Sequence, residues 1–367
     1  MKLKLILKDG TEITGESFGY SPKNSEEIDG EVVFNTAMVG YPETFTDPSY
    51  RGQILVCTYP MIGNYGVPQE CELDKSLSKH LESLKVHPRG IIISEYCEEP
   101  SHWQSKSTLA DFLKKHKIPA IKGVDTRALT QKLREHGVML GKIANESVAY
   151  SKSMTFNDPN INNLVAEVSV NEKTILKPKG KIKATVALLD CGIKHNIIRS
   201  FLDRGVQVIR LPWGYDLSEL KDKFDGVFIS NGPGDPETVD KTVESVKWAM
   251  KNDKKIFGIC LGCQIMGLAA GAKTYKLKYG HRSANQPCSD VGTERCYITS
   301  QNHGYAIDEK TLPKGWKVWF KNANDGTVEG IKHTSKPWFS VQFHPEASPG
   351  PEDAAYLFDY FIERLVK

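Results

Sequence analysis

The sequence predicts an α/β protein in two parts, an N-terminal mixed α/β domain followed by a domain built on a doubly wound, mostly parallel sheet. After residue 183, short apolar runs alternate with helical patterns, which is typical of parallel strands joined by helices. The chain begins instead with a hairpin pattern around Asp9 and Gly10. Its 367 residues, of which 40% are hydrophobic, are enough for two cores of ordinary size.

The first domain is predicted to span residues 1–150. Apolar runs of strand length occur at residues 3–7, 11–18, 32–34, 53–58 and 90–94. Helical periodicity predicts helices over residues 76–84, 107–116 and 125–136. Residues 151–183 are polar, and we interpret them as the linker between the domains.

The second domain is predicted to span residues 184–367. Its predicted strands lie at residues 185–189, 206–211, 226–230, 255–258 and 338–343. Its predicted helices lie at residues 194–204, 217–223, 239–251, 264–270 and 353–365. Ligands of such sheets bind beyond the carboxyl ends of the strands, so we expect the functional residues there.

Cys260 lies between Gly258 and Gly262, where an apolar strand turns into a helix. Glycines on both sides of such a turn permit strained backbone angles and close packing, as in a nucleophile elbow. A thiol at a helix N-terminus is also favoured as the thiolate. Cys260 is therefore a candidate nucleophile.

The strand at 338–343 leads into His344 and Glu346. If the strand's period of two continues, imidazole and carboxylate lie on one face, and the carboxylate can orient the histidine. We assign the roles of nucleophile, general base and orienting acid to Cys260, His344 and Glu346, and this chemistry requires no metal.

The loop at residues 230–236 follows another predicted strand, and its two glycines can present backbone N–H groups to an oxyanion. Single histidines elsewhere are expected to be surface or satisfied core residues, and Cys71 could be exposed. Five further cysteines lie in or beside apolar runs and are predicted to be buried: Cys57, Cys97, Cys191, Cys288 and Cys296.

Charge and hydropathy argue against a nucleic-acid-binding, a membrane or a secreted protein. The net charge is only +3, and the lysines and arginines are interspersed with acidic residues. This pattern argues against nucleic-acid binding and against a polybasic segment that binds membranes. No apolar run approaches about 20 residues, and the apolar start ends at Lys8, too early for a signal peptide. We therefore expect reduced thiols and a cytoplasmic location.

Four motifs resemble the triad class of glutamine amidotransferases: Gly-Ile-Cys-Leu-Gly at 258–262, Ser-Asn-Gly-Pro-Gly-Asp-Pro at 230–236, Ser-Gln-Asn-His-Gly-Tyr at 300–305 and Gln-Phe-His-Pro-Glu at 342–346. In the first half, Val-Gly-Tyr-Pro-Glu at 39–43, Ile-Gly-Asn-Tyr-Gly at 62–66 and Gly-Val-Asp-Thr-Arg at 123–127 resemble the glutaminase subunit of carbamoyl phosphate synthetase. The resemblance covers essentially the whole chain. Segments 272–276 and 322–326 look most like the large fused eukaryotic synthetases.

The resemblance implies that Cys260 attacks the side-chain amide of L-glutamine, and that the ammonia passes to a synthetase large subunit or a fused synthetase domain. It implies an oxyanion site at the N–H groups of Leu261 and Gly234. It also implies glutamine recognition by Ser49, Gly232, Gln264, Asn302, Gly304 and Tyr305. Ser49 lies in the first domain, which would then close one side of the pocket. No phosphate-binding loop motif is present, so we expect no cofactor in this chain and Mg-ATP in the partner.

Position 263 departs from the family, where histidine is usual. Cys263 creates a Cys-x-x-Cys pattern with Cys260, which raises a thiol-disulfide redox protein as an alternative function. It also suggests a reversible, inactivating disulfide between the two residues. A non-catalytic regulatory subunit is a third class. The sequence leaves open whether this is a separate subunit or part of a fused polypeptide, and whether it serves pyrimidine or arginine synthesis.

Overall fold

The computed structural model describes residues 1–23, 26, 28–74 and 76–366, and the chain divides into two compact units, Met1–Ile161 and Asn162–Lys367. Lys367, which the predicted second domain includes, lies outside the described residues. The division falls within the segment that we interpreted as a linker. The later part of that segment contains β12 (Thr174–Leu176), which pairs with β14 and so belongs to the second unit.

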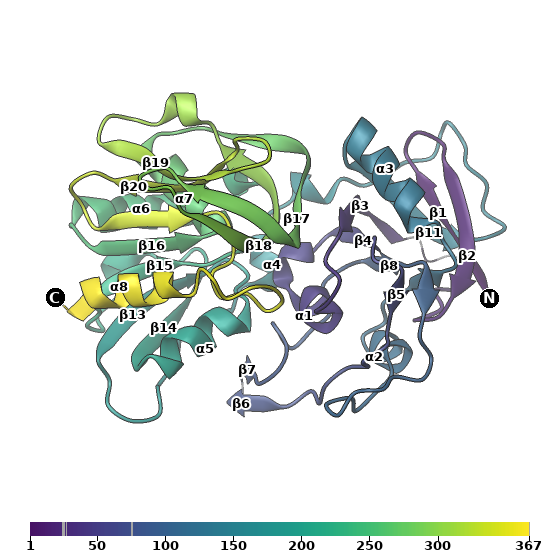
Figure 1. The fold of residues 1–367 in the computed structure, drawn as a ribbon, viewed down its shortest axis with the longest axis horizontal. Coiled ribbons are helices and arrows are strands. Elements are labelled where there is room, and N and C mark those ends of the chain that lie inside the picture. Colours follow the sequence, from purple (N-terminus) through teal and green to yellow (C-terminus); the bar gives the residue numbers. More distant parts are fainter. Residues whose placement is uncertain (24–25, 27, 75, 367) are drawn as a thin grey trace. The chain divides into compact units, whose positions relative to one another are not determined.

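The first unit is built on a closed sheet with the strand order β1-β11-β3-β4-β8-β10-β2 (Figure 1). These strands are β1 (Lys2–Leu7), β2 (Glu12–Ser17), β3 (Ile28–Asn35), β4 (Gln53–Cys57), β8 (Gly90–Ile92), β10 (Ala120–Lys122) and β11 (Met139–Asn145). The helices are α1 (Tyr41–Thr46), α2 (Leu109–Lys115) and α3 (Thr126–His136). The predicted hairpin is confirmed, since β1 pairs antiparallel with β2.

The helix predicted over residues 76–84 is wrong. Leu77–Ser78 form the short strand β7, which pairs with β6 (Glu72–Asp74). Side chains take up the backbone groups that a helix would use: the Ser78 hydroxyl accepts from the Leu81 N–H, and the Thr46 hydroxyl accepts from the Glu82 N–H. Such bonds compete directly with helix formation.

The second unit contains a ten-stranded sheet with the order β12-β14-β13-β15-β16-β21-β20-β19-β17-β18. Five neighbouring strands are parallel: β13 (Ala184–Asp190), β14 (Val206–Pro212), β15 (Gly226–Ile229), β16 (Lys255–Ile259) and β21 (Trp338–Val341). The antiparallel strands are β17 (Thr274–Asp290), β18 (Cys296–Ile307), β19 (Trp316–Asn322) and β20 (Val328–His333). The parallel strands were predicted, but the antiparallel ones from β17 to β20 were not.

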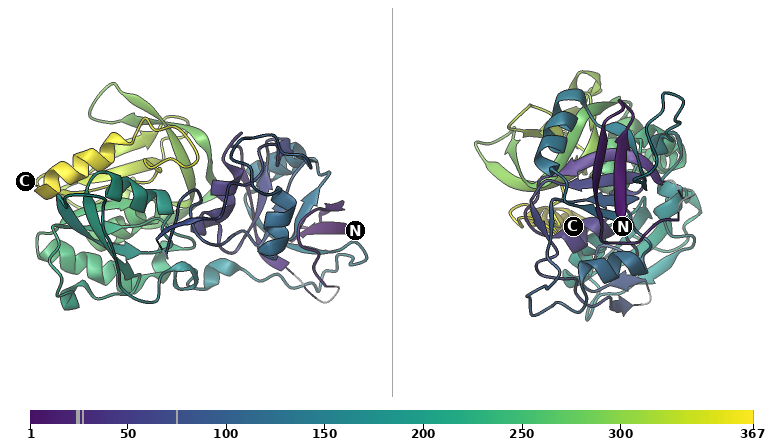
Figure 2. Two further views of the ribbon diagram at one scale, coloured as in Figure 1. Left: turned by 90° about the horizontal axis from the view of Figure 1, so that it is seen from below. Right: turned by 90° about the vertical axis from the view of Figure 1, so that its right-hand side faces the viewer.

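Helices cover both faces of the parallel strands, as predicted for a doubly wound sheet (Figures 1 and 2). On one face, α5 (His195–Asp203) and α8 (Tyr356–Val366) pack through a cluster of aromatic rings: Phe201, Phe228, Phe257, Phe339, Phe358 and Phe361. The opposite face is covered by α6 (Asp240–Lys251) and α7 (Leu261–Ala270), whose aliphatic residues join the buried core. The helix predicted over residues 217–223 is only a 3-10 turn, Leu217–Glu219.

Burial of the cysteines follows the prediction in part. Cys57, Cys191 and Cys288 are buried. Cys296 is exposed because it begins β18, the edge strand of the sheet, and Cys97 is partly exposed in the turn after β9 (Glu95–Tyr96). Among the residues that the structure describes, no helix combines the length and apolar character needed to cross a membrane.

Replacing Phe257 with alanine should destabilise the second unit by about 3–5 kcal/mol, because the ring is fully buried against Phe228 and Phe361 and the cavity cannot collapse easily. Urea unfolding of the full chain, followed by near-ultraviolet circular dichroism, measures the loss. The control Tyr275→Ala removes an aromatic ring that is 44% exposed and should cost less than about 1 kcal/mol. Equal losses in the two variants would contradict the packing argument.

Candidate active site

The strand β16 ends at Ile259, and Cys260 turns the chain directly into α7. Cys260 has φ 55° and ψ −107°, a conformation that residues with a side chain rarely adopt. Its N–H donates to the Val341 carbonyl over 2.9 Å, and its carbonyl accepts from the N–H groups of Cys263 and Gln264. The turn is therefore held by the neighbouring strand on one side and by the first turn of the helix on the other.

The flanking glycines confirm the predicted close packing, but the strained backbone angle is not theirs. The strained angle falls on Cys260 itself, whereas Gly258 and Gly262 provide space. A Cβ atom on Gly262 would lie 2.2 Å from the Ile229 carbonyl oxygen, and one on Gly258 would lie 2.6 Å from the Gly262 carbonyl oxygen. The helix can thus approach β15 and β16 closely enough only because both positions lack a side chain.

His344 and Glu346 meet as the sequence predicted, although not by continuation of the strand. β21 ends at Val341, and His344 is held by its N–H, which donates to the Ser300 carbonyl over 2.8 Å. The turn that follows brings the Glu346 carboxylate 2.6 Å from Nδ1 of His344. Both side chains are buried.

Lys194 completes this group, and sequence reasoning missed it. Its ammonium donates to Oε1 of Glu346 over 3.0 Å and to the Ala347 carbonyl over 2.5 Å, and the side chain is 3% exposed. Lys194 stands at the N-terminus of α5, at the carboxyl end of β13. A cation at that end of a helix opposes the helix dipole, and this was the available signal.

The charges of this group strongly shift its acid–base behaviour. Burial raises the pKa of Glu346, but Lys194 and His344 outweigh burial and lower this pKa to about 2. Burial lowers the pKa of His344, but the Glu346 carboxylate outweighs burial and Lys194 and raises this pKa to about 10. The favoured state is therefore a buried imidazolium–carboxylate pair.

The Cys260 thiol also affects the pKa of His344. Cys260 lies close enough to raise the pKa of His344, although no hydrogen bond of good geometry joins the sulfur to the imidazole. Among the described residues, Nε2 of His344 has no hydrogen-bond partner. The imidazole thus holds Glu346 with one nitrogen and keeps the other free for a proton transfer.

Several other predicted residues of the second unit surround Cys260. The Cys260 thiol donates to the Asn302 carbonyl over 3.6 Å. Nε2 of Gln264 donates to the Tyr305 carbonyl over 2.9 Å, and a Cβ atom on Gly232 would lie 2.9 Å from the side chain of Leu261.

For three further predicted residues, the structure gives only local geometry. Gly234 has φ +86° in the loop after β15, and a Cβ atom on Gly304 would lie 3.2 Å from the Arg282 guanidinium. Ser49 lies in the first unit, in a 3-10 turn where its N–H donates to Asp47. The oxyanion role of Gly234 and the glutamine-binding roles of all the residues predicted from the resemblance stay predictions.

Cys263 has the surroundings of a core residue. Its sulfur accepts a hydrogen bond from the Ser340 hydroxyl over 3.2 Å, and burial raises the pKa of its thiol to about 12. Such a thiol supplies almost no thiolate at neutral pH, so Cys263 is poorly suited to act as an attacking nucleophile. The disulfide with Cys260 stays a prediction, and all eight cysteines are free in the structure.

The two halves of the chain match two different protein families. Residues 187–364 match the family Glutamine amidotransferase class-I, and residues 5–143 match the family Carbamoyl-phosphate synthase small chain, CPSase domain. The arginine-specific small chain of carbamoyl phosphate synthase from Saccharomyces cerevisiae is 46% identical over 373 residues, covering 100% of this chain and 89% of the relative. The chain belongs to the carbamoyl-phosphate synthase small-chain family.

Other relatives of this chain are much longer. The multifunctional protein CAD of Squalus acanthias is 51% identical over 361 residues, which cover 98% of this chain but only 16% of the relative. The chain thus spans about a sixth of the length of these multifunctional relatives. A solved glutamine amidotransferase from Thermotoga maritima covers 50% of this chain and 99% of its own, with 16% identity and a TM-score of 0.41.

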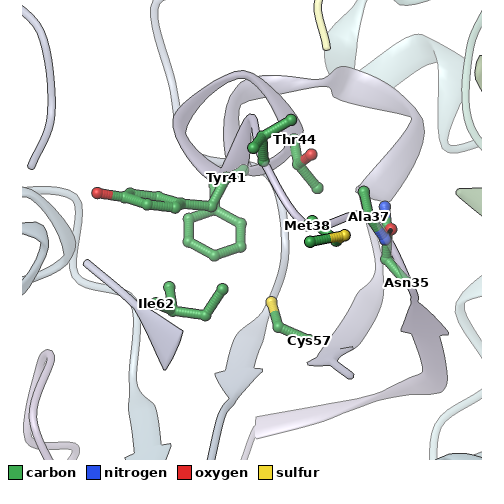
Figure 3. A pocket seen from close by; sticks show the side chains of 9 residues that line it. Asn35, Ala37, Met38, Tyr41, Thr44, Cys57 and Ile62 are labelled. Atoms are coloured by element: carbon green, nitrogen blue, oxygen red, sulfur yellow. Dashed lines mark hydrogen bonds between the residues drawn. The ribbon is translucent and has the colours of Figure 1, made fainter. Parts of the chain in front are cut away.

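Two of the first-unit motifs that resemble the glutaminase subunit, at residues 39–43 and 62–66, are joined by hydrogen bonds. The Tyr41 hydroxyl donates to the Gly66 carbonyl over 2.6 Å, and the Tyr65 hydroxyl accepts from the Gly40 N–H over 2.6 Å. The segment that leads into α1 also lines a small hollow with β3 and β4, where Tyr41 and Met38 lie near Cys57 (Figure 3). These contacts give motifs 39–43 and 62–66 a structural role within this unit.

Acid should weaken the fold through Glu346. Its pKa is lowered from 4.5 to about 2, so the ionised carboxylate stabilises the fold above pH 4.5, and this stabilisation of about 3 kcal/mol is lost as the pH falls toward 2. Urea midpoints measured between pH 5 and pH 3 should fall more steeply for the wild type than for Glu346→Gln. The control Asp353→Asn, at an exposed carboxylate, should follow the wild type. Parallel curves for the wild type and Glu346→Gln would contradict the assignment.

Proposed function

We propose that this chain hydrolyses L-glutamine to glutamate and ammonia through a thioester on Cys260. The observation that carries the proposal is the strained turn that holds Cys260 at the carboxyl end of a parallel strand, next to the buried pair of His344 and Glu346. Membership of the family with a class-I glutamine amidotransferase region supports the same reaction.

The reaction would run in two halves. The Cys260 thiol passes its proton to His344, and the resulting thiolate attacks the side-chain carbonyl carbon of glutamine. The tetrahedral intermediate collapses as the C–N bond breaks and the protonated His344 gives that proton to the leaving ammonia. His344 then takes a proton from water, whose oxygen attacks the thioester, and glutamate leaves as the C–S bond breaks. Glu346 holds the imidazole and stabilises its protonated form throughout.

Charge that develops on the carbonyl oxygen would be stabilised by N–H groups of Leu261 and Gly234. Leu261 is the first residue of α7, and the first N–H groups of a helix have no partner within it. One such donor contributes about 3 kcal/mol to lowering the barrier. The glutamine itself would be bound by six residues that are all assigned from the resemblance: Ser49, Gly232, Gln264, Asn302, Gly304 and Tyr305.

The ammonia would serve a carbamoyl phosphate synthetase partner, which supplies bicarbonate activation with Mg-ATP. Relatives of both kinds support a partner, since one is a separate small chain and others are multifunctional proteins that continue well beyond the matched region. We propose no cofactor for the hydrolysis, because thiol, imidazole and carboxylate suffice, and we propose a cytoplasmic location. Pyrimidine and arginine synthesis are both consistent with the relatives.

Cys260→Ser should lower glutamine hydrolysis by at least about 10³-fold, because a serine hydroxyl is far less ionised than a thiol in the same place. Glutamate release measures turnover, and calorimetry with glutamine should show that binding is retained. The control Cys263→Ser should stay within about tenfold of the wild type, since Cys263 has a packing role. Turnover by the Cys260→Ser protein would exclude the mechanism.

Lys194→Met should shift the acid limb of the kcat profile to higher pH. Without the ammonium the pKa of Glu346 rises, so the carboxylate is protonated, and His344 loses its support, at a higher pH than in the wild type. The pH dependence of glutamate release measures the shift, and kcat should fall by about 10–100-fold. Lys173→Met, which removes a solvent-exposed ion pair with Asp222, is the matched control. Superimposable profiles would rule out this role for Lys194.

A further inference from the structure

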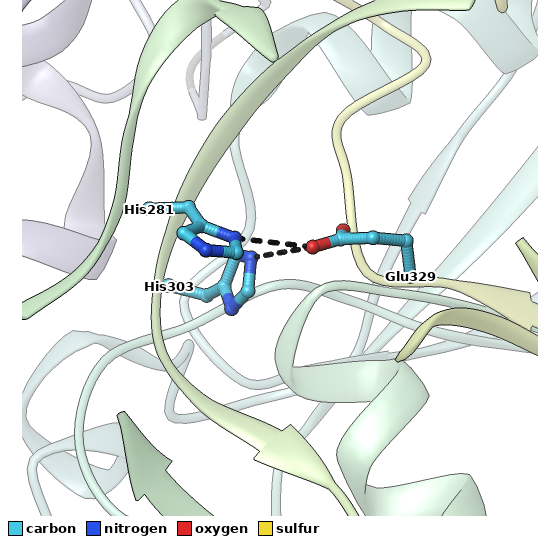
Figure 4. Close-up of side chains that lie close together, drawn as sticks. All are labelled: His281, His303 and Glu329. Atoms are coloured by element: carbon cyan, nitrogen blue, oxygen red, sulfur yellow. Dashed lines mark hydrogen bonds and ion pairs between the residues drawn. The ribbon is translucent and has the colours of Figure 1, made fainter. Parts of the chain in front are cut away.

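A second cluster of titratable side chains lies outside the triad, on the antiparallel part of the sheet. His281 of β17 and His303 of β18 are directly opposite each other in the pairing of these strands, and Glu329 comes from β20 (Figure 4). All three are buried, and their nearest nitrogen and oxygen atoms lie within 4.8 Å of one another. The three residues are 22 to 48 positions apart in the sequence and meet only when the strands pair, so no short spacing marks them as a group.

The outer nitrogen of each histidine faces an acceptor. Nε2 of His281 lies 2.9 Å from the carboxylate of Asp325, and Nδ1 of His303 lies 2.9 Å from the carbonyl oxygen of Tyr305. Neither oxygen can donate, so each outer nitrogen must carry the proton. In a neutral imidazole the inner nitrogen then has a lone pair and no hydrogen.

Both inner nitrogens face the same carboxylate oxygen. Oε1 of Glu329 lies 3.2 Å from Nδ1 of His281 and 3.4 Å from Nε2 of His303 (Figure 4). Two lone pairs directed at an anionic oxygen repel it unless a positive charge lies between them. The NH₂ group of Asn322 also lies 3.4 Å from Nδ1 of His281, but it is neutral and does not supply that charge. The other oxygen of Glu329 is buried and, among the described residues, has no hydrogen-bond partner.

A second oxygen faces His303. Oε1 of Gln301 lies 3.3 Å from Nε2 of His303. The amide cannot easily turn around, because the Thr299 hydroxyl already donates to the Gln286 carbonyl and needs the Gln301 NH₂ group as its own donor.

A divalent metal ion bound between the three side chains would resolve the conflict, and a proton on an inner nitrogen is the alternative that the experiments below distinguish from it. In a tetrahedral zinc site with bonds of about 2.0–2.2 Å, neighbouring ligand atoms are separated by about 3.3 Å, close to the two distances observed here. Zinc-binding histidines commonly donate their other N–H to a carboxylate or a backbone carbonyl, which are the partners of His281 and His303. The two charges of the ion would also balance the carboxylates of Glu329 and Asp325.

We propose that His281, His303 and Glu329 form a structural binding site for a divalent ion of the zinc class. The ion would join β17, β18 and β20 next to the segment that contains Asn302, Gly304 and Tyr305. An approach from solvent is available past Asp325, whose side chain is 43% exposed and lies against His281. This proposal is independent of the proposed hydrolysis, since none of the three ligands contacts Cys260.

Zinc binding by the full chain tests the proposal directly. The measurements use a Cys260→Ser background, so that the candidate nucleophile does not itself take up the metal. After treatment with a chelator, addition of zinc and dialysis, atomic emission should find about one zinc per chain. The midpoint of thermal unfolding should rise by at least about 3 °C with zinc.

Variants assign the ligands. Glu329→Gln keeps the shape of the side chain and removes its charge, and bound zinc should fall below about 0.2 per chain. The control His333→Gln removes another imidazole from the same strand and should retain the full zinc content. If Glu329→Gln does not fold, His281→Gln provides the same comparison.

The cobalt complex identifies the donor atoms without any variant of the cluster. Cobalt(II) bound by nitrogen and oxygen should show visible d–d bands and lack the strong near-ultraviolet charge-transfer band of thiolate ligands. Less than about 0.2 zinc per chain in the background protein, equal zinc in Glu329→Gln, or a thiolate band in the cobalt complex would overturn the proposal, and the cluster would then be a protonated hydrogen-bond network.

Discussion

The second unit depends on one tight strand-to-helix turn, in which Cys260 connects the end of β16 to the start of α7. A residue with a side chain at φ 55° costs about 1–3 kcal/mol, so the surrounding structure must hold it. The Val341 carbonyl fixes its N–H, and the missing side chains at Gly258 and Gly262 let the helix lie against β15. The apolar residues that follow, including Ile265 and Met266, are fully buried in the core and offset this cost. Packing of the helix thus offsets the strain of the turn that holds Cys260, whose side chain is itself buried.

The second constraint is the burial of three charged groups in a row. Separating Lys194, Glu346 and His344 from water is costly, and replacing such a group with apolar residues often stabilises a protein. The arrangement is therefore poorly explained by stability alone. Its effect is to keep Glu346 ionised and to favour the protonated imidazole, while one imidazole nitrogen stays unpaired beside the thiol. These are the properties that an acid–base group needs when charge develops on a nearby sulfur.

Features encoded locally were predictable from the sequence. The parallel strands appear as short apolar runs, Cys260 stands between two glycines, and His344 and Glu346 are two residues apart. Lys194 was missed because it is 152 positions from Glu346 and meets it only through the strand order. The long hairpin of β17 and β18 was missed because β17 is irregular: its pairing shifts twice, and its burial does not alternate. Residues 76–84 show the opposite failure, since their helical pattern loses to side-chain hydrogen bonds.

The strand β18 shows why the missed region matters for the site. Neighbouring residues of a strand point to opposite faces, so Asn302 and His303 cannot face the same surroundings. The backbone of Asn302 accepts from the Cys260 thiol, while the ring of His303 turns toward Glu329. The carbonyl of Tyr305 joins the two sides, because it accepts from Gln264 in α7 and faces His303. The Tyr305 carbonyl is thus a single backbone group shared by the buried histidine pair and the helix that begins at Leu261.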